Sequence, residues 1–160
     1  MPRALLVYGS NSSNAYTAAG LVANELKSAG FDITVLSAAE AKLPDVAAAD
    51  LVILGSCTWS KPTSDGHELQ GQPQELFESF ADKLRPEKYP GKKFAVFATG
   101  DSRYTMFCGA ADYIEKLVRD IGGTQVGESL RIDGLTASQE DVVRVWARAI
   151  GTAYLNSHSS

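Results

Sequence analysis

Short apolar runs alternate with stretches of helical period along this chain. Strands are predicted over Arg3–Tyr8, Asp50–Ser56 and Lys93–Thr99, over Phe31–Ser37, where apolar and polar residues alternate, and over Thr124–Ile132, which is broken near Gly127. Apolar residues three and four positions apart predict helices over Asn14–Ala29, Pro73–Leu84, Cys108–Ile121 and Ser138–Tyr154. Gly30 follows the first helix as a stop signal, and Ser138 is the expected N-cap of the last. Residues 156–160 are expected to fray.

Five strands that alternate with helices predict a parallel sheet with helices on both faces. The strand runs are apolar on both faces, which is typical of strands buried on both sides. Right-handed crossovers then give a doubly wound sheet, and the five-stranded order 2-1-3-4-5 fits a chain of 160 residues. We therefore expect a single three-layered α/β domain over residues 1–155.

A ligand of such a sheet binds outside the carboxyl ends of the strands, where the strand order reverses. This rule selects the loops over residues 9–16, 55–72 and 99–109. The first loop is rich in hydroxyl and amide side chains, carries no charge, and leads directly into a helix N-terminus. Free N–H groups and the helix dipole favour a phosphate there, although a plain helix N-cap is the alternative. The loop lacks both the lysine-bearing P-loop motif and the GxGxxG fingerprint.

The other two loops each supply an aromatic residue. Trp59 follows a buried strand, and Tyr104 lies beyond the turn formed by Gly100, Asp101 and Ser102. Two aromatic side chains on adjacent loops can hold a flat heterocycle between them. Trp59 could instead only cover the end of the sheet. Together with a phosphate site, the pair suggests a mononucleotide with a planar ring.

Charge and residue content limit the kinds of partner and the compartment that we expect for this chain. The net charge is −4, which argues against nucleic acid because phosphate backbones attract clusters of lysine and arginine. We see no signal peptide and no apolar run near the ~18 residues that cross a bilayer, so we expect a cytoplasmic protein without membrane contact. Cys57 and Cys108 lack metal-ligand spacing and are expected to be free thiols. His67 is expected to be solvated, and no catalytic acid, base or nucleophile is evident.

Three segments resemble the flavodoxins, and above all those of sulfate-reducing bacteria. They are Gly55-Ser56-Cys57-Thr58-Trp59, Glu68-Leu69-Gln70, and the run from Gly100 through Tyr104 and Phe107 to Ala110. The resemblance covers essentially the whole chain. It implies a flavodoxin-like fold and FMN as the cofactor. It also implies that the first loop binds the phosphate, that Trp59 and Tyr104 cover the two ring faces, and that backbone groups near 99–102 and 108 contact the ring edge. The expected FMN-binding residues are Ser10, Asn11, Ser12, Ser13, Asn14, Ala15, Cys57, Thr58, Trp59, Ser60, Lys61, Thr99, Gly100, Asp101, Tyr104, Phe107 and Cys108.

The sequence departs from the family pattern at several of these positions. Ser13 replaces a glycine and Ala15 a threonine in the phosphate loop, which predicts weaker FMN binding. Ser60 replaces a glycine whose peptide is thought to flip on reduction, and serine makes that flip costlier. Lys61 and Arg103 stand where relatives often have acidic or neutral residues. Their charge predicts a less strongly reducing cofactor.

The resemblance implies a single-electron carrier, not an enzyme. The expected donor is an NAD(P)H-dependent flavoprotein reductase, and the expected acceptor is an enzyme such as a cytochrome P450. We expect a monomer. Two alternatives stay open: an FMN-dependent quinone or nitro reductase, and a binding or signalling module that lacks flavin.

Overall fold

The structure is a computed structural model. It describes residues 1–9, 13–62, 65–66, 68–100, 108–134 and 136–157, with the backbone alone described at residues 13, 59–62 and 68–72. Within this part of the chain, no helix combines the length and apolar character needed to cross a membrane.

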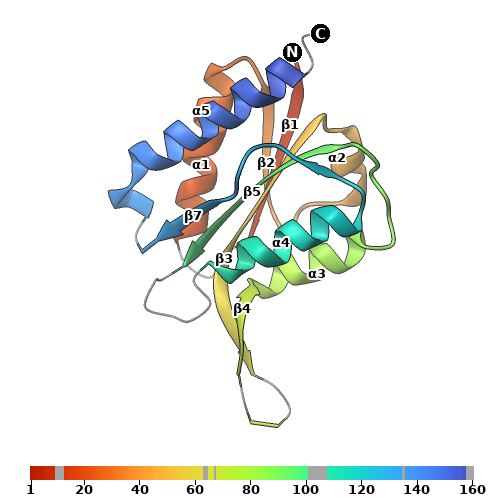
Figure 1. The fold of residues 1–160 in the computed structure, drawn as a ribbon, viewed down its shortest axis with the longest axis vertical. Coiled ribbons are helices and arrows are strands. Elements are labelled where there is room, and N and C mark those ends of the chain that lie inside the picture. The colour runs from red at the N-terminus through yellow and green to blue at the C-terminus, as the bar shows by residue number, and fades with distance from the viewer. Residues whose placement is uncertain (10–12, 63–64, 67, 101–107, 135, 158–160) are drawn as a thin grey trace.

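The described strands form one twisted sheet (Figure 1). Its strands are β1 (Arg3–Gly9), β2 (Asp32–Ser37), β3 (Leu51–Pro62), β4 (Glu68–Pro73), β5 (Lys93–Gly100), β6 (Thr124–Gln125) and β7 (Leu130–Asp133). The parallel order is β2-β1-β3-β5-β6, which confirms the predicted order 2-1-3-4-5. The predicted fifth strand is indeed split around Gly127, and its second piece, β7, also runs parallel to β5.

Helices cover both faces of this sheet. They are α1 (Ser13–Ser28), α2 (Leu43–Ala48), α3 (Glu75–Leu84), α4 (Gly109–Asp120) and α5 (Glu140–Ser157), with a short 3-10 turn, η1 (Thr136–Ser138). The helices α1 and α5 lie on one face, and α2, α3 and α4 lie on the other (Figure 1). Ser138 belongs to η1 and α5 begins at Glu140, so the predicted N-cap is wrong by one residue. Asn156 and Ser157 continue α5, although we expected them to fray, and residues 158–160 lie outside the described part.

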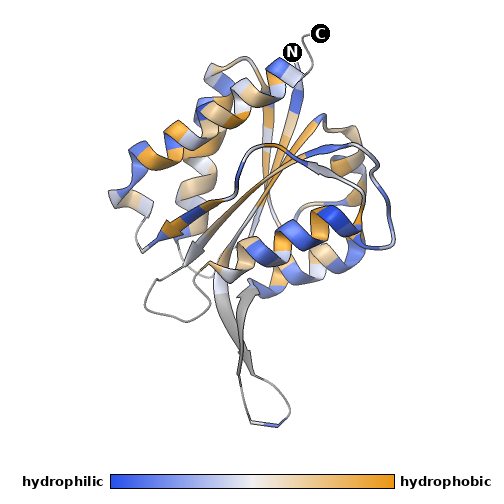
Figure 2. Cartoon of the chain, in the orientation of Figure 1, coloured by the Kyte–Doolittle hydropathy of each residue, from blue (hydrophilic) through white to orange (hydrophobic). Residues whose placement is uncertain are grey.

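Two apolar cores, one on each face, explain the near-continuous apolar strands. In β1, Leu5 and Val7 pack in the core beneath α3 and α4, whereas Ala4 and Leu6 pack in the core beneath α1 and α5. The central strands are accordingly apolar along their length, while the helices also carry hydrophilic residues (Figure 2). Burial on both faces removes the usual period-two alternation and leaves a run that the sequence shows directly.

The segment expected to be a long loop over residues 55–72 is mostly a hairpin. The strand β3 continues to Pro62, and the chain returns as the antiparallel strand β4, so that the ribbon projects from the sheet (Figure 1). The pairing shifts register between Trp59 and Lys61. Polar residues, glycine and proline fill this stretch, so its sequence has no strand-like apolar pattern. Backbone pairing makes the strands instead. The six-residue α2 is also absent from our expectations, because one buried side chain, Val46, gives no period.

Candidate cofactor site

The carboxyl ends of β1, β3 and β5 meet at one edge of the sheet. In the strand register, Gly9 lies beside Ser56, and Cys57 lies beside Thr99. The three segments expected to bind a ligand therefore leave the sheet next to one another. This edge also contains the point at which the chain departs toward β2 on one side and β3 on the other. Such a point is where doubly wound sheets bind ligands.

The first of these segments leads into α1. Ser10, Asn11 and Ser12 lie outside the described residues, and Ser13 is the first residue of the helix. The first turn of α1 contains no acidic side chain. The first N–H groups of a helix have no partner within the helix, and with the positive end of the dipole and no competing carboxylate they suit a phosphate.

Asn14 and Ala15 both have structural surroundings that the sequence does not reveal. The N–H of Thr136 donates to Asn14 Oδ1 at 3.3 Å, and Thr136 Oγ1 donates to the Asn14 carbonyl at 3.0 Å. Asn14 thus fastens the start of α1 to η1, a segment more than a hundred positions away. Ala15 is fully buried. The described contacts of these residues position the helix terminus.

A second set of contacts joins the end of β1 to the part of β3 where its parallel pairing ends. A Cβ on Gly9 would lie 2.7 Å from Phe77 Cβ and 2.9 Å from Gln74 Oε1, so the start of α3 requires glycine there. The side chain of Gln74 caps α3 by accepting from the Phe77 N–H at 3.0 Å. Its own N–H donates to Ser56 Oγ at 2.8 Å, and that hydroxyl donates to the Cys57 carbonyl at 2.9 Å. These hydrogen bonds therefore connect the start of α3 to β3 beside the end of β1.

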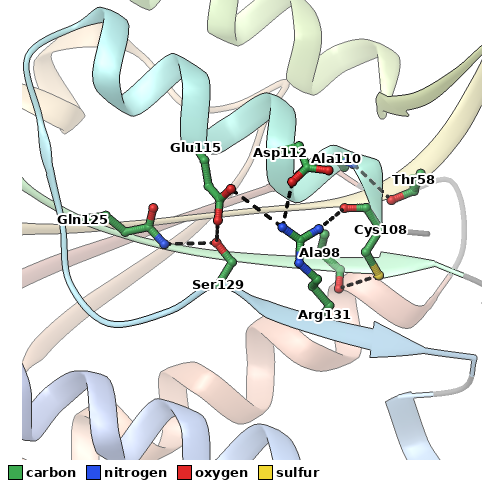
Figure 3. A network of polar contacts seen from close by, with 9 residues as sticks. All are labelled: Thr58, Ala98, Cys108, Ala110, Asp112, Glu115, Gln125, Ser129 and Arg131. Carbon is green, nitrogen blue, oxygen red and sulfur yellow. Dashed lines mark hydrogen bonds and ion pairs between the residues drawn. The ribbon is translucent and has the colours of Figure 1, made fainter. Parts of the chain in front are cut away.

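The predicted residues on β3 continue from this edge into the hairpin. Cys57 is buried, and Thr58 Oγ1 accepts from the Ala110 N–H at 3.3 Å, which connects β3 to the first turn of α4 (Figure 3). The backbone of Trp59, Ser60 and Lys61 lies in the extended part of β3, but their side chains lie outside the described part of the structure. Ring stacking by Trp59 stays a prediction.

The third segment begins at the end of β5. Thr99 is buried, and Gly100 is the last residue of the strand. Asp101, Tyr104 and Phe107 lie outside the described residues, so their contacts with the ring also stay predictions.

Cys108 lies directly before α4 and has an unusual backbone. With φ of 50° and ψ of 36°, it is the one described residue other than glycine in the left-handed region. A Cβ on Gly100 would approach Cys108 N to 3.0 Å, so the two backbones pack closely. The Cys108 thiol lies 3.5 Å from the Ile132 carbonyl and 3.7 Å from the Ala98 carbonyl. Burial raises the pKa of this thiol to about 12.

Sequence reasoning missed Arg131, which comes from β7 (Figure 3). Its Nη1 donates to the Cys108 carbonyl at 3.1 Å, and its Nη2 donates to Asp112 Oδ1 at 2.8 Å and lies 3.7 Å from Glu115 Oε1. Glu115 also accepts from Ser129 Oγ, which in turn accepts from Gln125. The sequence did not single out Arg131, because the predicted fifth strand is mixed in polarity and carries a second charge at Glu128.

Comparison with known proteins decides the family. The flavodoxin family profile matches residues 6–146. The chain belongs to the flavodoxin family. A flavodoxin from Maridesulfovibrio salexigens is 34% identical over 151 residues, covering 94% of this chain and 97% of the relative. A second, from Nitratidesulfovibrio vulgaris, is 34% identical over 154 residues, covering 96% and 99%. The predicted likeness to flavodoxins of sulfate-reducing bacteria is confirmed.

Solved structures agree with this assignment. Oxidised flavodoxin 2 from Bacillus cereus superposes with a TM-score of 0.79 at 28% identity, covering 97% of this chain and 99% of that structure. As a flavodoxin, the protein uses FMN as its cofactor and acts in electron transport. The bound flavin supplies the electron chemistry, and the chain supplies binding and local charge. The first turn of α1, free of acidic side chains, fits the phosphate of that cofactor.

Proposed function

We propose that this flavodoxin carries single electrons from an NAD(P)H-dependent flavoprotein reductase to an acceptor enzyme such as a cytochrome P450, without catalysing a reaction on its own. The observation that carries this proposal is the chemistry of the described edge. Its side chains are hydroxyls and amides, a buried thiol whose pKa is raised, and the Arg131 guanidinium held by two carboxylates. None of these groups is arranged to abstract or deliver a proton. Among the described side chains of this edge, none competes with the flavin as the reactive group, as a carrier requires.

The proposal includes a monomer in the cytoplasm. Neither Cys57 nor Cys108, both of which lie in the described part of the chain, forms a disulfide, which agrees with a reducing compartment. The net charge of −4 favours docking on basic protein surfaces over binding to nucleic acid.

The flavin absorption band, followed in three mixtures, tests the proposed electron transfer. The purified protein, saturated with FMN, is first mixed with NADPH alone, then with NADPH and a flavoprotein reductase, and finally with a ferric cytochrome P450 as acceptor. We expect bleaching of the flavin band only after the reductase is added, and reoxidation when the acceptor follows. Prompt bleaching by NADPH alone would indicate the quinone or nitro reductase. A protein that refuses added FMN would indicate the flavin-free module.

We infer that the expected FMN-binding residues hold the cofactor, and that Ser13 and Ala15 make phosphate binding weaker than the glycine and threonine of the family pattern do. Ala15 is buried in the first turn of α1, the part of the site that fits the phosphate. A hydroxyl bonded to a charged group contributes about 1.5–3 kcal/mol, so the double change Ser13→Gly with Ala15→Thr should tighten FMN binding at least about tenfold. Fluorescence titration measures the change. Riboflavin, which lacks the phosphate, is the control ligand and should bind the variant and the parent equally. FMN binding that does not tighten refutes this weaker phosphate binding.

We also infer that Lys61 makes the cofactor less strongly reducing. A cation ~10 Å from a reduced, anionic ring stabilises it by about 1.7 kcal/mol at an effective dielectric of ~20, before salt screening. For a one-electron step this corresponds to roughly 70 mV. Lys61→Glu should therefore lower the potential of the second one-electron step by tens of millivolts. Lys27→Glu makes the same charge change in the last turn of α1, at the opposite end of that helix from the site. Equal potentials in Lys61→Glu and the parent protein would end this interpretation.

A further inference from the structure

Cys108 adopts a backbone conformation that a residue with a Cβ atom avoids. Its φ of 50° lies in the left-handed region, which glycine and asparagine tolerate best. Contacts from outside must therefore hold it. The thiol lies against the carbonyls of Ala98 and Ile132, and the Cys108 carbonyl accepts both the Ala111 N–H at 2.9 Å and Arg131 Nη1 at 3.1 Å. The bond from Arg131 is the one contact in this set made by a charged side chain.

The position of Arg131 is not explained by the stability of α4. A cation near the N-terminus of a helix opposes the helix dipole. Asp112 in the first turn and Glu115 in the second offset this charge. The guanidinium fork is planar and rigid, and it binds the Cys108 carbonyl and both carboxylates at once (Figure 3). A lysine has a single ammonium group and cannot reproduce this geometry. The hydrogen bond to the Cys108 carbonyl therefore explains the placement of Arg131 better than the stability of α4 does.

The end of β7 also holds the last residue of β5. Gly134 N donates to the Gly100 carbonyl at 2.8 Å, and Gly100 lies beside Asp133 in the strand register. Gly100 and Cys108 are the described residues on either side of positions 101–107. Both are therefore fixed by one short stretch, residues 131–134. Both lie at the carboxyl end of β5, where a sheet of this type binds its ligand.

We propose that Arg131 is a positioning residue for the FMN ring. By holding the Cys108 backbone in the left-handed conformation, it prepares the β5 side of the site before the cofactor binds. Ligands bind more tightly to a site whose backbone is already ordered, because less ordering accompanies binding. This inference rests on FMN as the cofactor and is independent of the donor and acceptor proposed above.

Affinity for the ring alone is the measurement that separates positioning from general stability. Riboflavin contains the ring without the phosphate, so it reports only the part of the site that Arg131 prepares. We compare FMN and riboflavin binding to the apo-protein by flavin fluorescence quenching in the wild type, Arg131→Gln and Arg131→Lys. We expect Arg131→Gln to bind both ligands about tenfold more weakly, because one charge-assisted bond is lost. Arg131→Lys keeps the charge without the fork and should lie between the two.

Arg148→Gln is the matched control. Arg148 also pairs with a carboxylate, Glu25, at 3.4 Å, but it does so between α5 and α1 on the other face of the sheet. Its loss changes the net charge equally and should leave both affinities within about twofold. Circular dichroism and thermal unfolding verify that each apo-variant is folded at the titration temperature. If Arg131→Gln is unfolded there, the Arg131→Lys titration decides.

Each outcome of these titrations bears on one identifiable part of the proposal. Unchanged riboflavin affinity in folded Arg131→Gln, or an equal loss in Arg148→Gln, overturns the positioning role. A loss of thermal stability with unchanged riboflavin affinity assigns Arg131 to α4 stability alone. A wild-type protein that binds neither flavin overturns the cofactor itself. A wild type that binds FMN but fails to pass electrons contradicts only the proposed carrier function.

Discussion

Gly55, in the middle of β3, provides a sharp test of the packing beneath the cofactor edge. It lies beside Phe97 of β5 in the register. A Cβ at Gly55 would come within 2.0 Å of Phe97 Cζ and 2.3 Å of Phe97 Cε2, so the ring lies directly over the glycine. Phe97 is fully buried and packs edge-on against Trp146 at 6.3 Å between ring centroids. Because the ring is fully buried, any movement away from an added Cβ would displace neighbouring core side chains.

Gly55→Ala should therefore destabilise the protein strongly. Overpacking of a closed core costs typically 1–3 kcal/mol, and an overlap with three ring atoms belongs at the upper end, about 3 kcal/mol. For a chain of this size that loss lowers the melting temperature by roughly 6–12 °C. Urea unfolding of the apo-protein, followed by far-UV circular dichroism, measures the free energy directly, provided that the m-value is unchanged.

Gly20→Ala is the matched control for this change. Gly20 lies within α1, and a Cβ there would meet no atom within 4 Å. The same added methyl should stabilise the protein by about 0.5–1 kcal/mol, because alanine is the better helix former. Adding Phe97→Leu to Gly55→Ala should make the pair less harmful than the sum of the two single changes. If Gly55→Ala falls within about 0.5 kcal/mol of the wild type, the packing argument is wrong.

Three further perturbations address the edge and the opposite end of the sheet. The pKa of the Cys108 thiol is raised to about 12, above its ordinary value of 9.0. The stability that the neutral thiol contributes to the folded protein is therefore complete below pH 9 and is lost as the pH rises toward 12. Between about pH 7.5 and 10.5, urea unfolding should show the wild-type apo-protein losing about 2 kcal/mol more stability than Cys108→Ala, and equal losses would contradict this. Thr136→Val removes the hydroxyl bond to Asn14 and should weaken FMN binding severalfold while riboflavin titrations stay unchanged; unaltered FMN affinity would refute the role of η1. Lys92 Nζ donates to the Val46 and Ala49 carbonyls at the end of α2, so Lys92→Met should cost about 1–2 kcal/mol and speed hydrogen exchange in α2. Unchanged exchange in α2 would contradict this role of Lys92.

The central sheet could be predicted from the sequence because its strands are buried on both faces. A run such as Lys93–Thr99 is too short for a typical helix and favours a buried strand, and the alternation with helices then predicts the parallel order. The hairpin of β3 and β4 could not be predicted, since its pairing is made by backbone groups and its side chains follow no apolar period. The same holds for α2, which buries a single valine.

Part of the cofactor site could likewise be predicted from the sequence, and part of it could not. The position of the three loops follows from the topology, and the identity of the ligand follows from the motifs around Trp59 and Tyr104. What the sequence conceals is how the loops are held in place. Thr136 and Arg131 reach Asn14 and Cys108 across gaps of 122 and 23 positions. No local sequence pattern predicts such a contact, because the contact depends on how the end of the last strand is placed relative to the other strands.

The interrupted outer strand has a consequence for how this protein behaves among its partners. An unbroken edge strand displays a ladder of unpaired N–H and C=O groups, to which any other extended chain can add. Here that border consists of two residues in β6, a turn at Gly127, and four residues in β7. Neither piece is long enough to serve as a template for a second sheet. On this side of the sheet, a second extended chain therefore finds no long row of unpaired backbone groups to which it could add.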